Sequence, residues 1–502
     1  EKQREAAQTL DGPLLIVAGA GSGKTRALTY RIANLIAQKK AQPWQILAVT
    51  FTNKAAHEMA RRVEALLGPN GIPFEGHEFA GLSPKNRPLM GTFHSVALRI
   101  LRTHTALAGR QSGFTIYDTS DTHSVMKRLL KEQRLDEDTL KPHKVLAVIS
   151  ACKQKMISPA QLAAEATLYS QRQLAEIYTL YEKRLQENNA LDFDDLLVSA
   201  VQLFQNHPAI LESFQDRWRY ISVDEYQDTN AVQYQFIQQL AKKHRNLCVI
   251  GDSDQSIYRF RGADLNNILE FERDYPEARV IALEQNYRST PVILNAANAV
   301  IEKNTRRKSK TMWTTIEGGE RIEVHHTENE TEEARQVARE IRTLAVAGVP
   351  LSQIVVLYRT NAQSRAVEEA FLREGLAYKV VGGLRFYARK EVKDLLAYLR
   401  LIHSSFDAES LLRIINVPPR RIGESSLQKL QAFAMNRSLK LAEVLPHLSM
   451  VEALSQKPKA ALTAFWAMIE RWKEAAKTLS ASALLRRVME ESGYEAYLKD
   501  GT

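Results

Sequence analysis

The sequence predicts an α/β protein in which a parallel sheet is interrupted by a helical insertion and is followed by a second, similar unit. Short apolar runs, of which residues 14–18 are the first, are typical of strands that are buried on both faces. Each run leads into a segment with helical spacing, and this alternation favours parallel strands joined by helices. From about residue 92 to about residue 214 the spacing is helical throughout, which predicts an inserted helical domain.

The first strand, residues 14–18, runs directly into a glycine-rich turn and then into a helical pattern. The turn, residues 19–23, holds three glycines and is followed by Lys24 and Thr25. Glycine lets successive N–H groups converge on one anion, and the positive end of the next helix points to the same place. Lys24 adds a charge for the outer phosphates, and the Thr25 hydroxyl suits Mg²⁺. The pattern predicts a phosphate-binding loop with Ala18 in place of the usual first glycine; the alternative is an ordinary Gly-rich turn.

Composition sets broader limits on function. The 502 residues include 68 Lys plus Arg against 58 Asp plus Glu, and a net charge of +10 fits a polyanionic partner. Cys152 and Cys248 are the only cysteines, which excludes a disulfide framework and predicts a reducing, cytoplasmic setting. No apolar run approaches the length that crosses a bilayer, so no membrane association is expected.

A second strand, residues 46–50, is followed by Phe51 and Asn53 at the start of a helix. An aromatic ring and an amide at the carboxyl end of a strand suit stacking on a base and contact with a phosphate. A helix cap beside a core phenylalanine explains the same residues, and the sequence leaves both interpretations open.

Two adjacent acids follow a later strand, residues 220–223. Asp224 and Glu225 lie where open α/β sheets bind ligands, at the carboxyl end of a strand. Asp224 would hold the Mg²⁺ that Thr25 also contacts, and Glu225 would orient and deprotonate an attacking water. Together with the phosphate loop, this pair predicts a site that hydrolyses a nucleotide.

The strand at residues 247–250 leads into a segment with polar and aromatic residues. Gln255 is placed to contact a terminal phosphate. Aromatic and cationic side chains then alternate, a composition suited to stacking bases and holding phosphates. These residues are Tyr258, Arg259, Phe260 and Arg261.

After a strand at residues 279–282, Tyr287 and Arg288 precede a helix. Tyr287 is expected to stack on adenine, and Arg288 to act as an arginine finger in cis. The basic run 303–310 is predicted to be a solvated face rather than a binding site.

The rest of the chain predicts a second α/β unit and then a second helical region. Strands are expected at 321–325, 354–357 and 378–381, helices at about 332–346 and 364–374, and a helical pattern from about 389 onward.

Taken together, these stretches resemble the UvrD/Rep/PcrA family of superfamily 1 DNA helicases over essentially the whole chain. The motifs occur in the family's order, at residues 18–25, 50–56, 91–95, 224–228, 251–262 and 285–290. The resemblance implies two RecA-like P-loop domains, each with a mainly helical insertion, the second RecA-like domain being incomplete. The implied boundaries are 1–91 with 216–281 for the first RecA-like domain, 92–215 for its insertion, 282–380 for the second and 381–502 for the second insertion.

The resemblance also assigns residues. The implied ATP site comprises Gln3, Ala18, Gly19, Ala20, Gly21, Ser22, Gly23, Lys24, Thr25, Arg26, Asp224, Glu225, Gln255, Tyr287 and Arg288. Among these, Lys24, Asp224, Glu225, Gln255 and Arg288 are expected to be catalytic, and Thr25 and Asp224 to hold Mg²⁺. The implied single-strand track comprises Phe51, Asn53, His94, Phe193, Tyr258, Phe260, Arg261, Arg359 and Asn361. Tyr226 stands where the family has Phe, and Phe260 where it has Trp, so a weaker grip on a base is expected at Phe260.

The resemblance implies a function: ATP-driven, 3′-to-5′ movement on single-stranded DNA and unwinding at single-strand/duplex junctions. It also implies a role in DNA repair or replication, with proteins of those pathways as partners. Two later motifs of the family, a Gly-Leu-Glu loop and a second phosphate-sensing arginine, are not found before Thr502, and the chain begins at Glu1 rather than Met. A fragment truncated at its C-terminus, and slightly at its front, is therefore expected.

The alternative function is a disabled fragment that binds single-stranded DNA or a repair partner without unwinding. A DEAD-box RNA helicase would have a different second motif and no large helical insertions, and no nuclease motif follows that would indicate a helicase–nuclease.

Overall fold

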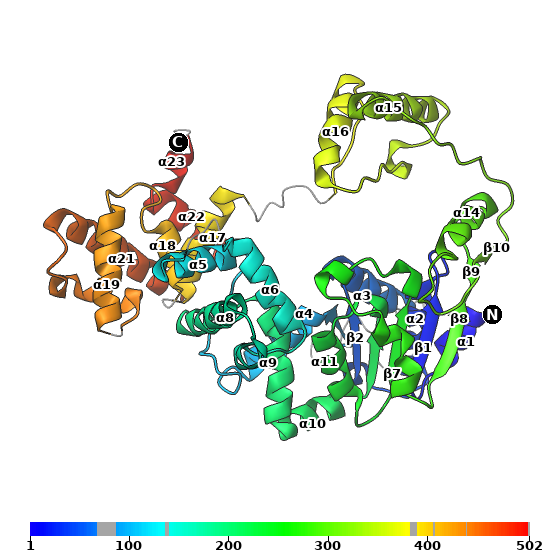
Figure 1. Cartoon of the computed structure of the whole chain (residues 1–502), viewed down its shortest axis with the longest axis horizontal. Helices are drawn as coiled ribbons and strands as arrows, with labels where there is room; N and C mark the ends of the chain where they lie inside the picture. Colours follow the sequence, from blue (N-terminus) through cyan, green and yellow to red (C-terminus); the bar gives the residue numbers. More distant parts are fainter. Residues whose placement is uncertain (68–86, 136–139, 382–388, 405–406, 438, 500–502) are drawn as a thin grey trace.

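A six-stranded parallel sheet forms the centre of the N-terminal part of the molecule (Figure 1). The computed structural model describes residues 1–67, 87–135, 140–381, 389–404, 407–437 and 439–499. Side by side, the strands are β3 (Leu89–Thr92), β2 (Ile46–Thr50), β6 (Tyr220–Val223), β7 (Leu247–Gly251), β1 (Leu14–Ala18) and β8 (Arg279–Leu283). The predicted α/β class is confirmed, and the expected bounds of β1, β2 and β6 match those of the structure.

Both faces of this sheet are covered, which explains why its strands are continuous apolar runs. All five residues of β1 are buried; Leu14 and Ile16 belong to the core on one face, and Leu15 and Val17 to the core on the other. The first face is covered by α1 (Lys2–Gln8), α2 (Lys24–Ala37) and α3 (Asn53–Leu67). The second is covered by α4 (Phe93–Thr103), α9 (Phe193–Asn206), α11 (Ala231–Ala241) and the short α12 (Asn266–Leu269) and α13 (Phe271–Asp274).

The expected inserted helices are present between β3 and β6. They are α4, α5 (Thr119–Glu132), α6 (Pro142–Gln154), α7 (Pro159–Glu165), α8 (Tyr169–Glu187), α9 and α10 (Pro208–Arg217). Helices α5, α6 and α8 enclose a core of their own, whereas α4 and α9 pack on the sheet. The short parallel strands β4 (Thr115–Ile116) and β5 (Ala190–Leu191) pair with each other.

A buried lysine joins these inserted helices. Lys153 on α6 is only 2% exposed, and its Nζ lies 2.7 Å from Asp192 and 2.6 Å from Asp195, at the start of α9. Asp192 is the N-cap of α9 and accepts the Asp195 N–H, so it caps the helix and pairs with the buried cation as well.

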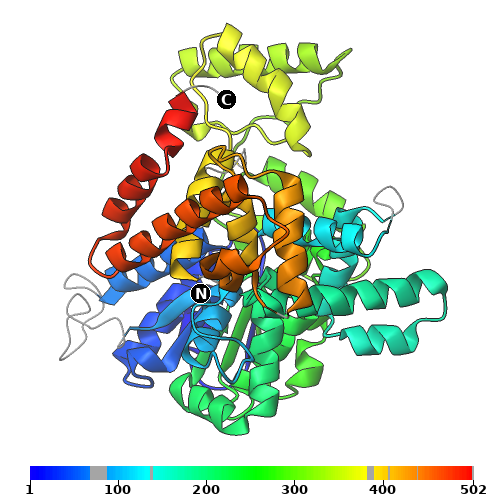
Figure 2. The ribbon, with the colours of Figure 1, turned by 90° about the vertical axis from the view of Figure 1, so that its left-hand side faces the viewer.

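The chain leaves the sheet after β8 through a small parallel pair, β9 (Gln285–Asn286) with β10 (Trp313–Thr314), separated by α14 (Pro291–Ile301). Beyond β10, the helices expected at about 332–346 and 364–374 are present as α15 (Glu330–Val346) and α16 (Ser364–Arg373), and they pack against each other. Both views of the ribbon place this helix pair apart from the six-stranded sheet (Figures 1 and 2).

The strands predicted for the second unit are wrong. Within the described residues, the segments 321–325, 354–357 and 378–381 belong to no strand and pair with none. A strand needs a neighbour for its backbone N–H and C=O groups, and these segments keep one apolar side in water. Val324 is 78% exposed, Val355 75% and Leu357 86%.

The C-terminal helices form a further core of their own. They are α17 (Lys390–His403), α18 (Ala408–Ile414), α19 (Glu424–Asn436), α20 (Leu441–Val444), α21 (Gln456–Ala475), α22 (Ala481–Glu491) and α23 (Tyr494–Lys499). This helical unit contacts α5 through ion pairs, of which Arg400 with Asp121 at 2.7 Å is one. No helix in the described ranges is both long enough and apolar enough to span a bilayer.

Candidate nucleotide and nucleic-acid sites

The glycine-rich loop joins the end of β1 to the start of α2. Gly21 has φ +69° and Gly23 has φ +83°, left-handed values that L side chains rarely adopt. Gly23 is the N-cap of α2, so that helix begins at Lys24 with its free N–H groups at the loop. Helix and loop therefore present backbone donors to one point, the arrangement that binds phosphate.

The Lys24 side chain lies at the centre of a polar cluster at the carboxyl edge of the sheet. Its Nζ donates to Glu225 Oε2 at 3.1 Å and to Gln255 Oε1 at 3.3 Å. Gln227 also donates to Glu225 Oε2, at 2.8 Å. Three chain segments far apart in the sequence thus place a cation, a carboxylate and an amide together, as the sequence predicted for Lys24, Glu225 and Gln255.

Asp224 lies beside this cluster and fits a divalent cation. It is only 5% exposed, and burial, followed by the charge of Glu225, raises its pKa to about 6. Its Oδ1 accepts the Glu225 N–H at 3.0 Å, but no Lys or Arg forms an ion pair with it in the described part of the chain. A metal ion would stabilise this buried carboxylate, and Mg²⁺ is held by one or two carboxylates, waters and phosphates. Thr25, in the first turn of α2, supplies a hydroxyl of the expected kind. No cluster of three or more His, Cys, Asp or Glu in the described ranges is arranged to hold a metal, so this site would rely on phosphates and waters for its other ligands.

The residues expected around adenine and the outer phosphates also lie at the loop. Gln3 Nε2 donates to the Ser22 carbonyl at 2.7 Å, and the Tyr287 N–H donates to the Gly21 carbonyl at 3.0 Å. A Cβ built on Gly21 would lie 2.8 Å from the Cβ of Arg288, so Arg288 starts beside the loop. The chain after β8 therefore brings Tyr287 and Arg288 against the phosphate loop.

A row of aromatic rings lies on the other half of the same sheet edge. Phe51, after β2, stacks on Tyr258 with ring centroids 5.3 Å apart, and Tyr258 lies 6.1 Å from Phe260. The Arg261 guanidinium lies 5.1 Å from the Tyr258 ring centroid. A second pair, His94 with Phe193 at 6.2 Å, follows after β3. Phe260 is 73% exposed and Phe193 51%, so their faces are available to a ligand.

Comparison with known proteins agrees with this geometry. A model of the UvrD/REP helicase N-terminal domain matches residues 1–276, more than half of the chain, and a model of the UvrD-like helicase C-terminal domain matches residues 281–478. The chain belongs to the UvrD/REP helicase family.

Individual relatives are named as ATP-dependent DNA helicases. The ATP-dependent DNA helicase PcrA of Bacillus subtilis (strain 168) is 46% identical over 498 residues, which is 99% of this chain and 65% of that protein. The proteins of that name from Staphylococcus epidermidis (strain ATCC 12228 / FDA PCI 1200) and Staphylococcus aureus (strain NCTC 8325 / PS 47) are each 45% identical, over 99% of this chain and 66% of theirs. The chain thus spans about two thirds of the length of these relatives. Because both UvrD-type models match, the comparisons give no support to the expected truncation or to inactivity inferred from it.

Two predicted site residues of this UvrD/REP-family chain lie away from the sheet edge. Arg359 and Asn361 are exposed on the segment just before α16, the helix that packs with α15 apart from the sheet (Figure 1). The structure does not bring them together with the aromatic row. Asn53, at the start of α3, and Arg26, in the first turn of α2, are at the sheet edge and exposed.

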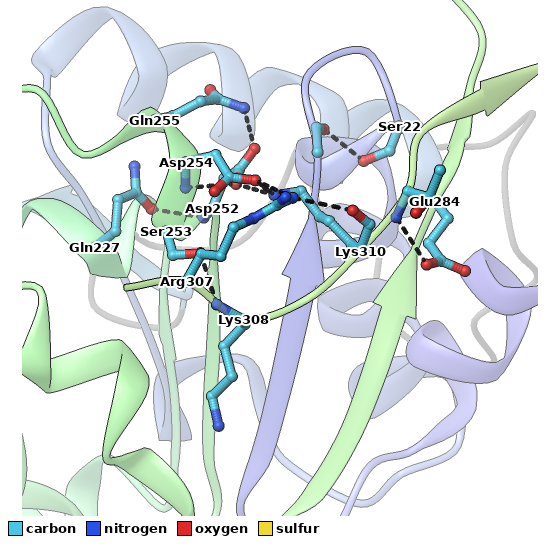
Figure 3. A network of polar contacts seen from close by, with 12 residues as sticks. Ser22, Gln227, Asp252, Ser253, Asp254, Gln255, Glu284, Arg307, Lys308 and Lys310 are labelled. Carbon is cyan, nitrogen blue, oxygen red and sulfur yellow. Dashed lines mark hydrogen bonds and ion pairs between the residues drawn. The ribbon is translucent and has the colours of Figure 1, made fainter. Parts of the chain in front are cut away.

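Sequence reasoning did not identify a second tier of the UvrD/REP site, which lies directly behind Gln255 and consists of Asp252, Asp254, Arg307 and Lys310 (Figure 3). Asp252 and Asp254 follow β7, and both are ion-paired with Lys310, whose side chain is 2% exposed. Arg307 adds an ion pair to Asp254 at 2.8 Å. The prediction that the basic run 303–310 is a solvated face is therefore wrong for Lys310 and Arg307. The chain after α14 turns back onto the end of β7, which buries Lys310 and partly buries Arg307. The available signal was the two acids shortly before Gln255, Asp252 and Asp254, since buried acids require cations.

Proposed function

We propose that the protein is an ATP-dependent DNA helicase that hydrolyses ATP with Mg²⁺ and moves 3′ to 5′ along single-stranded DNA. One observation carries the proposal: the same sheet edge holds the Lys24, Glu225 and Gln255 cluster at β1, β6 and β7, and the Phe51–Tyr258 stack between β2 and the segment after β7. The names of the relatives support both ATP and DNA as ligands.

The residues of this chain have complementary tasks at the nucleotide. The loop and the α2 N-terminus hold the phosphates, and Gln3 contacts adenine. An incoming terminal phosphate competes with Glu225 for Lys24, which frees the Glu225 carboxylate to orient a water and accept its proton. Thr25 and Asp224 would hold Mg²⁺, which would supply positive charge against the phosphates. Arg288 supplies a second positive charge to the leaving phosphate oxygens.

The aromatic row supplies the track for the single strand. Exposed rings bind any base through their faces, so Phe260 and Phe193 hold DNA without reading its sequence. Tyr258 belongs to the segment that also carries Gln255, only three positions away. A movement of Gln255 on phosphate binding would therefore also move Tyr258 in the single-strand track. Repeated ATP binding and hydrolysis would in this way drive movement along the DNA.

ATP hydrolysis by this chain, measured with and without oligo-dT, tests the proposal. We expect strong stimulation by DNA and weak stimulation by oligo-U of equal length. Binding of oligo-dT without any hydrolysis would contradict the proposal and favour a DNA-binding protein. Stimulation by RNA rather than DNA would instead favour an RNA helicase.

Polarity is tested by displacement of streptavidin from either end of a biotinylated oligo-dT, and we expect displacement from the 5′ end. We also propose that single-strand/duplex junctions are the substrate, that repair or replication proteins are the partners, and that the setting is cytoplasmic. Cys152 and Cys248 are both buried free thiols, which supports a reducing setting.

A further inference from the structure

The segment from Arg307 to Met312 lies across the back of the nucleotide site and is anchored there by buried charges (Figure 3). The Lys310 ammonium contacts the carboxylates of both Asp252 and Asp254, which are 3% and 8% exposed. Arg307 Nη2 donates to Asp254 Oδ2 at 2.8 Å and to the Lys310 carbonyl at 3.0 Å. Buried ions are retained only when they are paired, so each group here fixes the others.

Asp252 connects this anchor to the phosphate-contacting amide. Its Oδ2 accepts a hydrogen bond from Gln255 Nε2 at 2.6 Å. That bond fixes the amide orientation, so that Gln255 presents its Oε1 to Lys24, at 3.3 Å. Without a cation beside it, the buried Asp252 carboxylate would turn toward water, and Gln255 Nε2 would lose its acceptor.

A second connection runs through the backbone of the same residue. The Asp252 N–H donates to Gln227 Oε1 at 2.9 Å, and Gln227 Nε2 donates to Glu225 Oε2 at 2.8 Å. Asp252 is thus linked to both hydrogen-bond partners of Lys24. A displacement of Lys310 changes the position of the carboxylate as well as that of the amide.

The other end of the segment lies on the phosphate loop. A Cβ built on Gly19 would overlap the sulfur of Met312, so the methionine side chain rests on that glycine. Asn298 Nδ2 donates to the Met312 carbonyl at 3.0 Å, which ties the segment to α14. The segment then continues as β10 toward α15. A displacement of the chain beyond β10 is therefore expected to move Met312 against the phosphate loop and Lys310 against Asp252.

We propose that Lys310 is a positioning residue for ATP hydrolysis: it holds Asp252 so that Gln255 is oriented toward Lys24 and the terminal phosphate. This inference rests on the proposed ATPase function. Lys310 itself touches neither the nucleotide loop nor Lys24. Its effect therefore falls on turnover of ATP, which has a terminal phosphate, and leaves binding of ADP unchanged.

The test compares Lys310→Met with Lys303→Met, a matched change at an exposed lysine of the same basic run. For Lys310→Met we expect kcat of DNA-stimulated hydrolysis to fall about 10- to 100-fold, the scale of a small misplacement of a catalytic group. KM for ATP, affinity for a fluorescent ADP analogue and affinity for oligo-dT should stay within about twofold of wild type. Lys303→Met should match wild type in every measurement.

Circular dichroism and oligo-dT binding establish whether Lys310→Met is folded. If it is not, Lys310→Gln, which keeps a hydrogen-bond donor on a shorter side chain but removes the charge, takes its place, with a smaller fall in kcat expected and unchanged binding of ADP and oligo-dT. A folded variant with wild-type kcat overturns the inference while the ATPase proposal stands. So does an equal loss of ADP and DNA binding, because that indicates a purely structural role. Absence of hydrolysis in wild type overturns the proposed function and the inference with it.

Discussion

Replacing Phe260 by Ala is expected to weaken binding of single-stranded DNA and to leave the fold intact. The ring is 73% exposed and contacts Tyr258 at a centroid distance of 6.1 Å, so its removal opens no cavity. Surface substitutions of this kind change the free energy of unfolding by about 0.5 kcal/mol or less. Loss of one base-stacking ring costs about 1–3 kcal/mol of binding free energy. That range corresponds to an increase of about 5- to 160-fold in the Kd for DNA.

Fluorescence anisotropy of labelled oligo-dT at fixed salt concentration measures this Kd. Tyr169→Ala is the matched control, because Tyr169 is 80% exposed on α8, outside the aromatic row. Phe260→Trp should bind more tightly than wild type, since indole offers a larger face. A Kd for Phe260→Ala equal to that of Tyr169→Ala would refute the stacking role.

Salt dependence separates stacking from charge in the same segment. A phosphate contact releases a counterion, so Arg261→Ala should reduce the slope of log K against log salt by about 1. Phe260→Ala should leave that slope unchanged while it lowers affinity at every salt concentration. A reduced slope for Phe260→Ala would show that its loss acts through the neighbouring arginines.

Other substitutions test the remaining parts of the structure. Lys24→Ala should abolish ATP hydrolysis but leave oligo-dT binding largely unchanged, which steady-state kinetics and anisotropy would show; normal turnover would refute the nucleotide site. Glu225→Gln should lower kcat by about 10²- to 10⁴-fold with ADP affinity retained, and a kcat near wild type would exclude Glu225 as the base. Lys153→Met should destabilise the protein by about 3–5 kcal/mol in urea unfolding, because it leaves buried carboxylates without their cation. Burial and the neighbouring Asp192 already raise the pKa of Asp195, so the unfolded state loses that proton first as pH rises. The instability of Lys153→Met should therefore be smallest below the unfolded pKa of about 3.9 and grow as the pH rises above it; the opposite trend would contradict this account.

The parts of the fold that could be predicted from sequence are those fixed by local patterns with one structural solution. β1 is a continuous apolar run because helices cover both of its faces, and the run ends where the loop glycines begin. Lys24 must follow such a loop to reach a phosphate, so its place at the centre of the site also follows from local order. The apolar run at residues 354–357 has the same local pattern as a strand, but strand pairing depends on a neighbouring strand that the pattern cannot specify.

Lys310 shows why the second tier of the site could not be predicted. In the sequence it is one cation among several in a basic run, and such runs are usually solvated. Its burial depends on how the chain turns after α14, and on the carboxylates of Asp252 and Asp254 at the end of β7, more than fifty positions earlier. Neither segment alone signals the pairing. The acids reveal only that a cation is needed.

The short segment after β7 links the proposed nucleotide site to the proposed DNA track. Its first residues are held by Lys310 and Gln227 at Asp252, and its far end rests on the inserted helices. A Cβ built on Gly262 would overlap the Gln154 side chain of α6, which hydrogen-bonds to Asp194 beside Phe193. The rings of Tyr258 and Phe260 therefore lie between two fixed ends. Because both ends of the segment are in contact with other parts of the chain, we expect a displacement of Asp252 to move the rings of Tyr258 and Phe260 or to disturb the contact between Gly262 and α6.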